Sequence, residues 1–226
     1  MNPNDFEIIK EHMGKIASLI LWQSQAIRIN IENPYKLVSG NYSPIYVNCR
    51  QVISNPVFMD LFCTFAHALV RSNDMHPSTV AGGETAGIPF AAYVAQRLNI
   101  PMVYVRKKVK AHGIASLVEG TIGEREQVLL VEDLITDAAS KMSFIDSIQE
   151  AGGLCKNVLV VFDRNQGGKE SLASKQISLY SLTDMKVTLS AIEGRGLADQ
   201  NELSSVREYL HDPRTWHRLR NLEYHE

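Results

Sequence analysis

The sequence predicts an α/β protein with a central, mostly parallel sheet flanked by helices. Three runs of consecutive apolar residues, at 103–105, 128–131 and 158–162, are typical of strands buried on both faces, as in a parallel sheet. Segments with the 3–4 spacing of an amphipathic helix accompany them. The chain has 226 residues, of which 45% are hydrophobic and 21% charged, so it can form one domain with a sizeable core.

The first quarter of the chain predicts a helix, several short strands and a second helix. The first helix has an apolar stripe formed by Phe6, Ile9, Met13, Ile16 and Ile20. A short strand is expected over 26–29, and residues 35–50 are typical of two strands joined by a turn of Gly, Asn, Ser and Pro. Asn55 and Pro56 then open a helix, whose expected core face consists of Val57, Leu61, Phe65 and Leu69.

The remaining elements alternate between strands and helices. A strand over 78–81 leads into a turn that contains Gly82, Gly83 and Gly87, which allows close approach of a ligand, positive φ values or simply tight packing. After the strand at 103–105, five of the eight side chains in 106–113 can be cationic; we call this segment the basic loop. The last strand is expected over 177–182. Two short helices should follow, the second opened by Asp212 and Pro213, with Trp216 packing them onto the body.

Composition excludes several classes of protein. The formal net charge of −2 argues against a general nucleic-acid binder. Cys49, Cys63 and Cys155 show neither a disulfide framework nor a metal-binding pattern, so we expect them to pack in the core of a protein in the reducing cytoplasm. The chain shows no signal peptide and no run of 18 apolar residues, so we expect no association with a membrane.

The stretch 128–140 has the clearest chemical content. A buried strand is followed by Glu132 and Asp133, by a turn of small and hydroxylated residues, and by a helix. Ligands of open α/β sheets bind at the carboxyl ends of strands, where a helix N-terminus attracts anions. Carboxylates there can hold sugar hydroxyls or a divalent cation. A sugar phosphate fits this arrangement best; the alternative is an ordinary strand–turn–helix with two solvated acids.

This stretch resembles the phosphoribosyl diphosphate (PRPP) signature of type I phosphoribosyltransferases. Residues 35–46 are similar to the Phe-x-Leu-x-Ser-Gly-x-x-Ser-Pro-x-Tyr segment of the orotate phosphoribosyltransferases, which narrows the resemblance to that family. The resemblance spans 35–182 and implies a type I phosphoribosyltransferase fold. It divides a single domain into an N-terminal hood (1–52), a PRPP-binding core (53–192) and a C-terminal helical tail (193–226). It also implies an enzyme of pyrimidine (UMP) biosynthesis that converts orotate and PRPP to orotidine 5′-monophosphate and diphosphate.

The same resemblance implies the site residues. Orotate would contact Tyr46, Val47, Thr136 and Arg164. Catalysis would involve Lys110, His112 and Asp133, with Lys110 and His112 acting across the interface of a homodimer. Mg²⁺ would be held through PRPP near Glu132 and Asp133, with no direct protein ligand assigned. PRPP itself would be bound by Arg106, Lys107, Lys110, His112, Glu132, Asp133, Leu134, Ile135, Thr136, Asp137, Ala138, Ala139 and Ser140.

Several positions depart from the family pattern. Val38 and Ala86 stand where some relatives have lysine, and Ala138 and Ala139 where glycine is common. Alanine tolerates positive φ poorly, so either the turn keeps negative φ or phosphate affinity is reduced. Asp137 would repel a phosphate unless its side chain turns away or caps the helix. Two alternatives therefore stay open: a phosphoribosyltransferase for another base, and a non-catalytic PRPP-sensing protein of the same fold.

Overall fold

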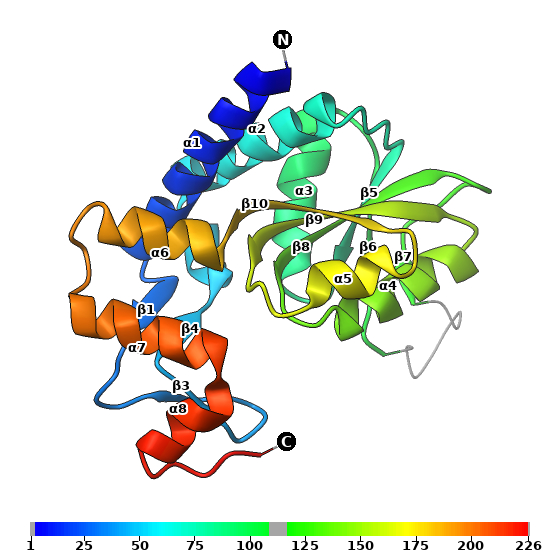
Figure 1. Ribbon diagram of the computed structural model, residues 1–226. Helices are drawn as coiled ribbons and strands as arrows, with labels where there is room; N and C mark the ends of the chain where they lie inside the picture. The colour runs from blue at the N-terminus through cyan, green and yellow to red at the C-terminus, as the bar shows by residue number, and fades with distance from the viewer. Residues whose placement is uncertain (1–2, 109–116, 226) are drawn as a thin grey trace.

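A computed structural model describes residues 3–108 and 117–225 and confirms the predicted α/β architecture (Figure 1). The central sheet has the strand order β10-β9-β8-β5-β6-β7. All neighbouring strands are parallel except β7, which pairs antiparallel with β6 at one edge. The strands are β5 (Thr79–Gly83), β6 (Met102–Val105), β7 (Val118–Glu119), β8 (Gln127–Ile135), β9 (Leu154–Asp163) and β10 (Ser178–Asp184).

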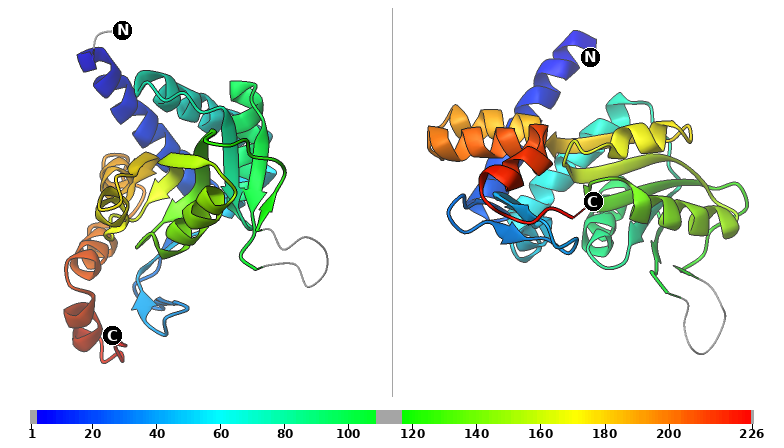
Figure 2. Two further views of the ribbon diagram at one scale, coloured as in Figure 1. Left: turned by 90° about the vertical axis from the view of Figure 1, so that its right-hand side faces the viewer. Right: turned by 60° about the horizontal axis from the view of Figure 1, so that its bottom comes forward.

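Helices cover both faces of this sheet (Figures 1 and 2). One face packs against α1 (Pro3–Gln23), α2 (Pro56–Ser72) and α3 (Gly87–Leu98), and the other against α4 (Ala139–Glu150) and α5 (Gly168–Ala173). Along β8, Leu129 and Val131 belong to the first core and Leu130 to the second. Because successive side chains of a strand point to opposite faces, an uninterrupted apolar run suits a strand that is covered on both sides.

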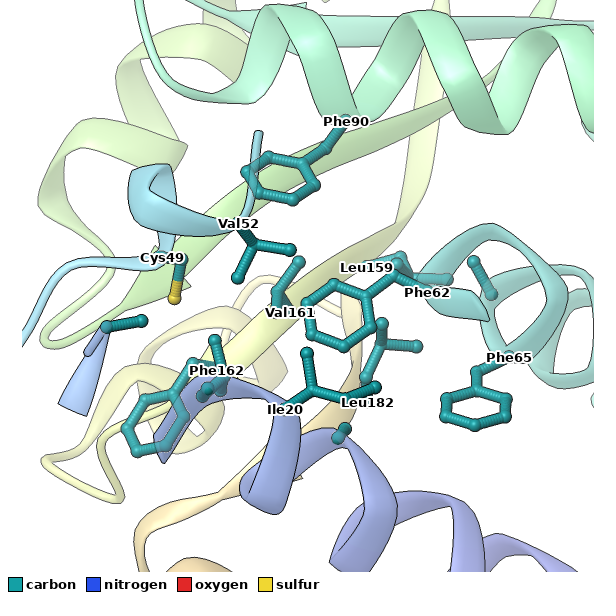
Figure 3. Close-up of a cluster of buried hydrophobic side chains, with 14 of the residues drawn as sticks. Ile20, Cys49, Val52, Phe62, Phe65, Phe90, Leu159, Val161, Phe162 and Leu182 are labelled. Carbon is teal, nitrogen blue, oxygen red and sulfur yellow. The ribbon is translucent and has the colours of Figure 1, made fainter. Parts of the chain in front are cut away.

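The larger core joins elements from the whole first half of the chain to the sheet. Figure 3 shows Ile20 of α1, Phe62 of α2 and Phe90 of α3 pointing toward Leu159 and Val161 of β9. Burial of such apolar side chains is the main favourable term in folding. The core therefore fixes the helices against the strands whose carboxyl ends form the site.

The predicted core face of α2 is only partly correct. Val57 is 64% exposed, whereas Met59, Phe62 and Leu69 are buried. A series of side chains four residues apart overshoots one helical turn by about 40° per step, because a turn holds about 3.6 residues. Val57 therefore lies far around the helix from Leu69. Asn55 does cap this helix, as expected, by accepting from the N–H groups of Val57 and Phe58.

Two small two-stranded sheets and two helices lie beside the carboxyl ends of the central strands. Strand β1 (Ile27–Ile29) pairs with β4 (Ile45–Val47), and β2 (Tyr35–Lys36) pairs with β3 (Tyr42–Ser43). The short 3₁₀ helix η1 (Cys49–Ser54) leads into α2, and α6 (Met185–Glu193), which the sequence did not predict, packs against α1. The predicted tail helices are α7 (Gln200–His211) and α8 (Pro213–Leu219), and they lie next to the blue hood strands in Figures 1 and 2. Among the described residues, no helix has the length and apolar character needed to span a bilayer.

Candidate active site

Strand β8 continues through both predicted acids and ends only at Ile135. The sequence placed Glu132 and Asp133 after the strand, but they belong to its last residues. Their exposed fractions are 4% and 8%, so they are not a pair of solvated acids. Since neighbouring side chains on a strand point in opposite directions, the two acids occupy different surroundings.

Glu132 is held by partners from two elements. Its Oε2 lies 3.0 Å from Nζ of Lys141 in the first turn of α4, and its Oε1 accepts from the N–H of Gly83, 2.9 Å away, at the end of β5. Burial raises the pKa of Glu132, and the ion pair with Lys141 opposes this shift. Glu132 therefore ties the β8–α4 turn to the turn that follows β5; we call this cluster, Gly83, Gly87, Glu132 and Lys141, the floor.

The glycines after β5 are explained by this carboxylate. A Cβ atom at Gly87 would lie 1.9 Å from Glu132 Oε1, and one at Gly83 would lie 2.5 Å from the same oxygen and 2.2 Å from Phe144. Neither glycine is among the residues with positive φ. Of the alternatives left open by the sequence, close packing is therefore the one seen here, and it is packing against the protein's own acid.

The β8–α4 turn contains a left-handed residue although that residue is an alanine. Ala138 has φ 74° and ψ −1°, so the alternative that the turn keeps negative φ is wrong. Asp137 Oδ1 accepts from the N–H of Ala139, the first residue of α4, at 3.0 Å, although the N-cap position itself is Ala138, which has no side-chain capping bond. The first N–H groups of a helix have no partner within that helix, so those at the start of α4 that Asp137 does not occupy can bind an anion.

Asp133, Arg164 and Cys49 come together from β8, the end of β9 and η1. Burial raises the pKa of the Cys49 thiol well above its ordinary value; the charge of Asp133 adds to this shift, and that of Arg164 opposes it. The backbone N–H of Arg164 donates to the carbonyl of Ile135 at 3.1 Å. Asp163 accepts from the N–H of Asn165, and among the described residues it forms no ion pair with Arg164.

The side chain of Arg164 is incompletely bonded. Its Nε is buried and has no hydrogen-bond partner among the described residues. An unpaired buried donor costs roughly 1–3 kcal/mol, more if it is charged. The hydrogen-bonding capacity of this guanidinium is thus not fully met by the described part of the chain. Arg164 also lines a cavity of about 360 Å³ against α6 and α7, which contains no other predicted site residue.

Of the two predicted orotate contacts in the hood, only Tyr46 exposes its side chain. Tyr46 is 38% exposed and its ring lies 5.3 Å from that of Tyr35, whereas Val47 is buried in the core. Any contact from Val47 to a ligand would therefore have to come from its backbone. Val38, one of the positions that depart from the family pattern, is fully exposed.

The first two residues of the basic loop, Arg106 and Lys107, are bonded to residues close to the floor. Arg106 pairs with Glu119 across the β6–β7 edge, with 3.3 Å between Nη1 and Oε1. The N–H of Lys107 donates to Glu84 Oε2 at 2.8 Å, and Glu84 belongs to the turn after β5. Lys110 and His112 lie outside the described residues. Lys107 therefore lies beside the turn that follows β5, where Gly83 contacts Glu132.

Sequence reasoning missed two residues of this region. Lys141 is buried in the first turn of α4. The helix dipole disfavours a cation at that end of a helix, so a lysine there was the one feature of the sequence that could have drawn attention to it. Tyr209 of α7 is buried, and the charge of Arg164 acts on its hydroxyl. Nothing in the local sequence around Tyr209 indicates that neighbour.

The sequence matches one family model and is similar to several proteins of known activity. The family model described as "Phosphoribosyl transferase domain" matches residues 51–188. The orotate phosphoribosyltransferase of Roseobacter denitrificans is 40% identical over 220 residues, covering 96% of this chain and 97% of its own length. That of Dinoroseobacter shibae is 38% identical with the same coverage.

Solved structures agree in fold. The orotate phosphoribosyltransferase from Aeropyrum pernix superimposes with a TM-score of 0.69 at 27% identity, covering 80% of this chain and 99% of that one. The UMP synthase of Leishmania donovani has a TM-score of 0.77 at 22% identity and covers 88% of this chain and 42% of that one, which is a likeness of fold alone.

Proposed function

The chain belongs to the phosphoribosyltransferase family and, within it, to the orotate phosphoribosyltransferases, and on that premise we propose how its site works. The reaction joins orotate to the ribosyl group of PRPP and releases diphosphate. The proposed site lies at the carboxyl ends of β8 and β9, between the β8–α4 turn and the hood. The division into hood (1–52), core (53–192) and tail (193–226) is part of this proposal.

Arg164 is the observation that carries the orotate site. Its buried Nε lacks an acceptor, and orotate brings a carboxylate. A guanidinium binds a carboxylate through a planar, charge-assisted pair of hydrogen bonds. Tyr46 supplies an aromatic surface on the hood, and Thr136 stands at the start of the β8–α4 turn. Together these groups fit a planar aromatic acid.

PRPP would be held by the β8–α4 turn and by Asp133. The N–H groups at the start of α4 that Asp137 does not occupy would bind the 5′-phosphate, and Asp133 would accept from the ribose hydroxyls. Glu132 already uses both oxygens on Lys141 and Gly83, so we assign it the task of holding the turn in shape. Arg106 and Lys107 would face the diphosphate once the basic loop closes.

Mg²⁺ would enter this site bound to PRPP. Among the described residues, no group of three His, Cys, Asp or Glu side chains could hold a metal ion. Mg²⁺ commonly keeps several waters and is bound through one or two carboxylates plus substrate phosphates. Asp133 is the residue that would contact it. The ion would neutralise charge on the diphosphate.

Catalysis would rest on positioning and electrostatics. Positive charge develops at the ribose C1 while negative charge develops on the leaving diphosphate, and no protein nucleophile is needed. Lys110 and His112 of the basic loop would reach the diphosphate from the neighbouring subunit of a homodimer, and loop closure would exclude water. The three cysteines are free and buried, which supports a location in the reducing cytoplasm.

The test is a turnover assay with protein, magnesium and PRPP against a panel of bases. We expect orotate absorbance to fall and orotidine 5′-monophosphate to form, with little reaction of uracil, adenine or hypoxanthine. Preferred turnover of another base would reassign the substrate. Binding of PRPP without turnover of any base would instead identify a PRPP-sensing protein.

A further inference from the structure

Three consecutive hood residues each lie against a different part of the tail. Asn41 is hydrogen-bonded to His225, and Tyr42 is hydrogen-bonded to His217. Ser43 neighbours Tyr209, where its side chain opposes the rise in the pKa of the Tyr209 hydroxyl that burial causes. The two groups are more than 160 residues apart in the sequence, as the separation of 175 between Tyr42 and His217 illustrates. The ribbon views place the red tail directly against the blue hood strands (Figures 1 and 2). We call these contacts the clamp.

His217 is the central member of the clamp. It is 0% exposed, and its Nε2 accepts from the N–H of Tyr42 at 2.9 Å. Its Nδ1 lies 2.6 Å from the carbonyl oxygen of Pro213, which can only accept. The proton is therefore on Nδ1, and the ring is neutral. Both ring nitrogens are used, one to hold α8 and the other to hold the hood.

Tyr209 connects the tail to the strand that carries the orotate contacts. Burial raises the pKa of its hydroxyl, and the neighbouring Ser43 side chain opposes this shift. The Ser43 hydroxyl donates to the carbonyl of Ile45 at 2.7 Å. Ile45 begins β4, which contains Tyr46 and Val47. The charge of Arg164 also acts on Tyr209. Tyr209 thus stands between the hood and the arginine assigned to orotate.

The end of the tail closes the clamp at the hairpin turn. Asn41 Nδ2 donates to the carbonyl of His225 at 2.8 Å, and the N–H of His225 donates to Asn41 Oδ1 at 2.7 Å. The His225 ring covers Gly40, where a Cβ atom would lie 2.9 Å from Cδ2. Gly40 has φ +93°, so glycine suits both the turn and the contact.

The tail is itself well enough packed to act as a support. Trp216 is 1% exposed, donates from Nε1 to Ser205 Oγ at 3.0 Å, and meets the rings of Tyr209 and His217 at 5.3 and 5.2 Å. Arg220 lies over the Trp216 ring at 4.4 Å. Aromatic packing of this kind orients the rings that contact the hood.

We infer that the tail positions the hood for orotate, with His217 and Tyr209 as positioning residues that act through β3 and β4 on Tyr46 and Val47. The inference rests on the proposed orotate site. It assigns no direct contact with substrate to the tail. The clamp should therefore set the affinity for orotate while leaving the PRPP site, which is built on β8 and α4, unchanged.

The test compares single substitutions in the full-length enzyme. His217→Phe keeps an aromatic ring but removes both ring nitrogens, and His217→Gln restores an acceptor at the position of Nε2. Tyr209→Phe removes only the hydroxyl. Arg218→Ala is the control, because Arg218 is an exposed neighbour of His217 on α8 whose side chain bonds Thr215 and not the hood.

Three quantities are measured for each variant: the KM for orotate, the Kd for PRPP by calorimetry, and hydrogen exchange of the amides in 37–47. We expect His217→Phe and Tyr209→Phe to raise the KM for orotate about fivefold or more, the effect of one lost hydrogen bond. The amide of Tyr42 should exchange about tenfold faster in His217→Phe, because its partner is gone. The Kd for PRPP should not change, His217→Gln should recover much of the loss, and Arg218→Ala should resemble the wild type.

Two results would overturn the inference. Equal losses of orotate and PRPP affinity would mean that the tail stabilises the whole fold. Faster exchange across 37–47 with an unchanged KM for orotate would mean that the clamp holds the hood without positioning substrate. If the wild-type enzyme does not react with orotate, the proposed function is refuted instead. The hydrogen exchange of the Tyr42 amide would still decide whether the clamp holds the hood.

Discussion

The floor and the clamp both support the site, but they are built from opposite chemistry. The floor is a buried charged pair, Glu132 with Lys141, with side-chain exposures of 5% and 9%. The clamp uses neutral groups, an imidazole, a phenol and an amide, and its outer end at His225 is exposed. A buried ion pair stabilises little when complete but costs a great deal when one partner is lost. Neutral hydrogen bonds contribute individually about 1 kcal/mol each. The floor should therefore tolerate almost no change, whereas the clamp can be weakened one bond at a time.

The largest effect is expected for Lys141→Met, which leaves Glu132 buried without its counter-charge. Loss of one partner of a buried pair costs about 3–5 kcal/mol in the free energy of unfolding. Urea denaturation followed by circular dichroism measures this loss. The double variant Lys141→Met with Glu132→Gln is the matched control, since it removes both charges and should recover a large part of the stability. A single variant as stable as the wild type would show that the pair is not the basis of the floor.

Arg164→Ala tests the residue that lies between the two regions. It should weaken orotate binding by about 1.5–3 kcal/mol, the range for hydrogen bonds to charged groups. PRPP binding should stay nearly intact, because the β8–α4 turn is unchanged. Calorimetric titration with each ligand separates the two effects. Equal losses for both ligands would contradict the assignment of Arg164 to orotate.

Asn41→Ala removes the two outermost bonds of the clamp. Because these bonds are neutral and partly exposed, the free energy of unfolding should fall by no more than about 1–2 kcal/mol. The melting temperature of the variant, compared with that of a Val38→Ala control at a fully exposed position of the same hairpin, measures the change. A loss as large as that of Lys141→Met would erase the contrast between clamp and floor.

The smallest effect is expected for Ala138→Gly in the β8–α4 turn. Glycine removes left-handed strain of roughly 1–2 kcal/mol but adds about 0.4–1 kcal/mol of freedom to the unfolded chain. A slight gain in stability, below about 1 kcal/mol, should result. Thermal unfolding with and without PRPP would show it. A clear loss of stability would mean that the alanine methyl group packs productively at this buried position.

Much of the local structure around the candidate site was predictable because its signals are local. The apolar run of β8, the two acids and the helix after the turn can all be recognised within one short stretch, and the structure confirms this order of elements. The stripe on α2 was partly wrong because a spacing of four residues drifts around a helix of 3.6 residues per turn. The acids were placed outside the strand because their polarity suggested an exposed end. Lys141 neutralises one of them, and the sequence did not reveal this pairing.

The sequence by itself determined the fold class, the strand–turn–helix at 128–140 and the family, since periodicity and motif are properties of neighbouring residues. Only the tertiary structure decided that Glu132 turns inward to Lys141, and that Gly83 and Gly87 make room for it. It alone brought His217 to Tyr42, 175 residues away. Contacts of this kind depend on how strands and helices pack, and residues so far apart leave no common pattern along the chain.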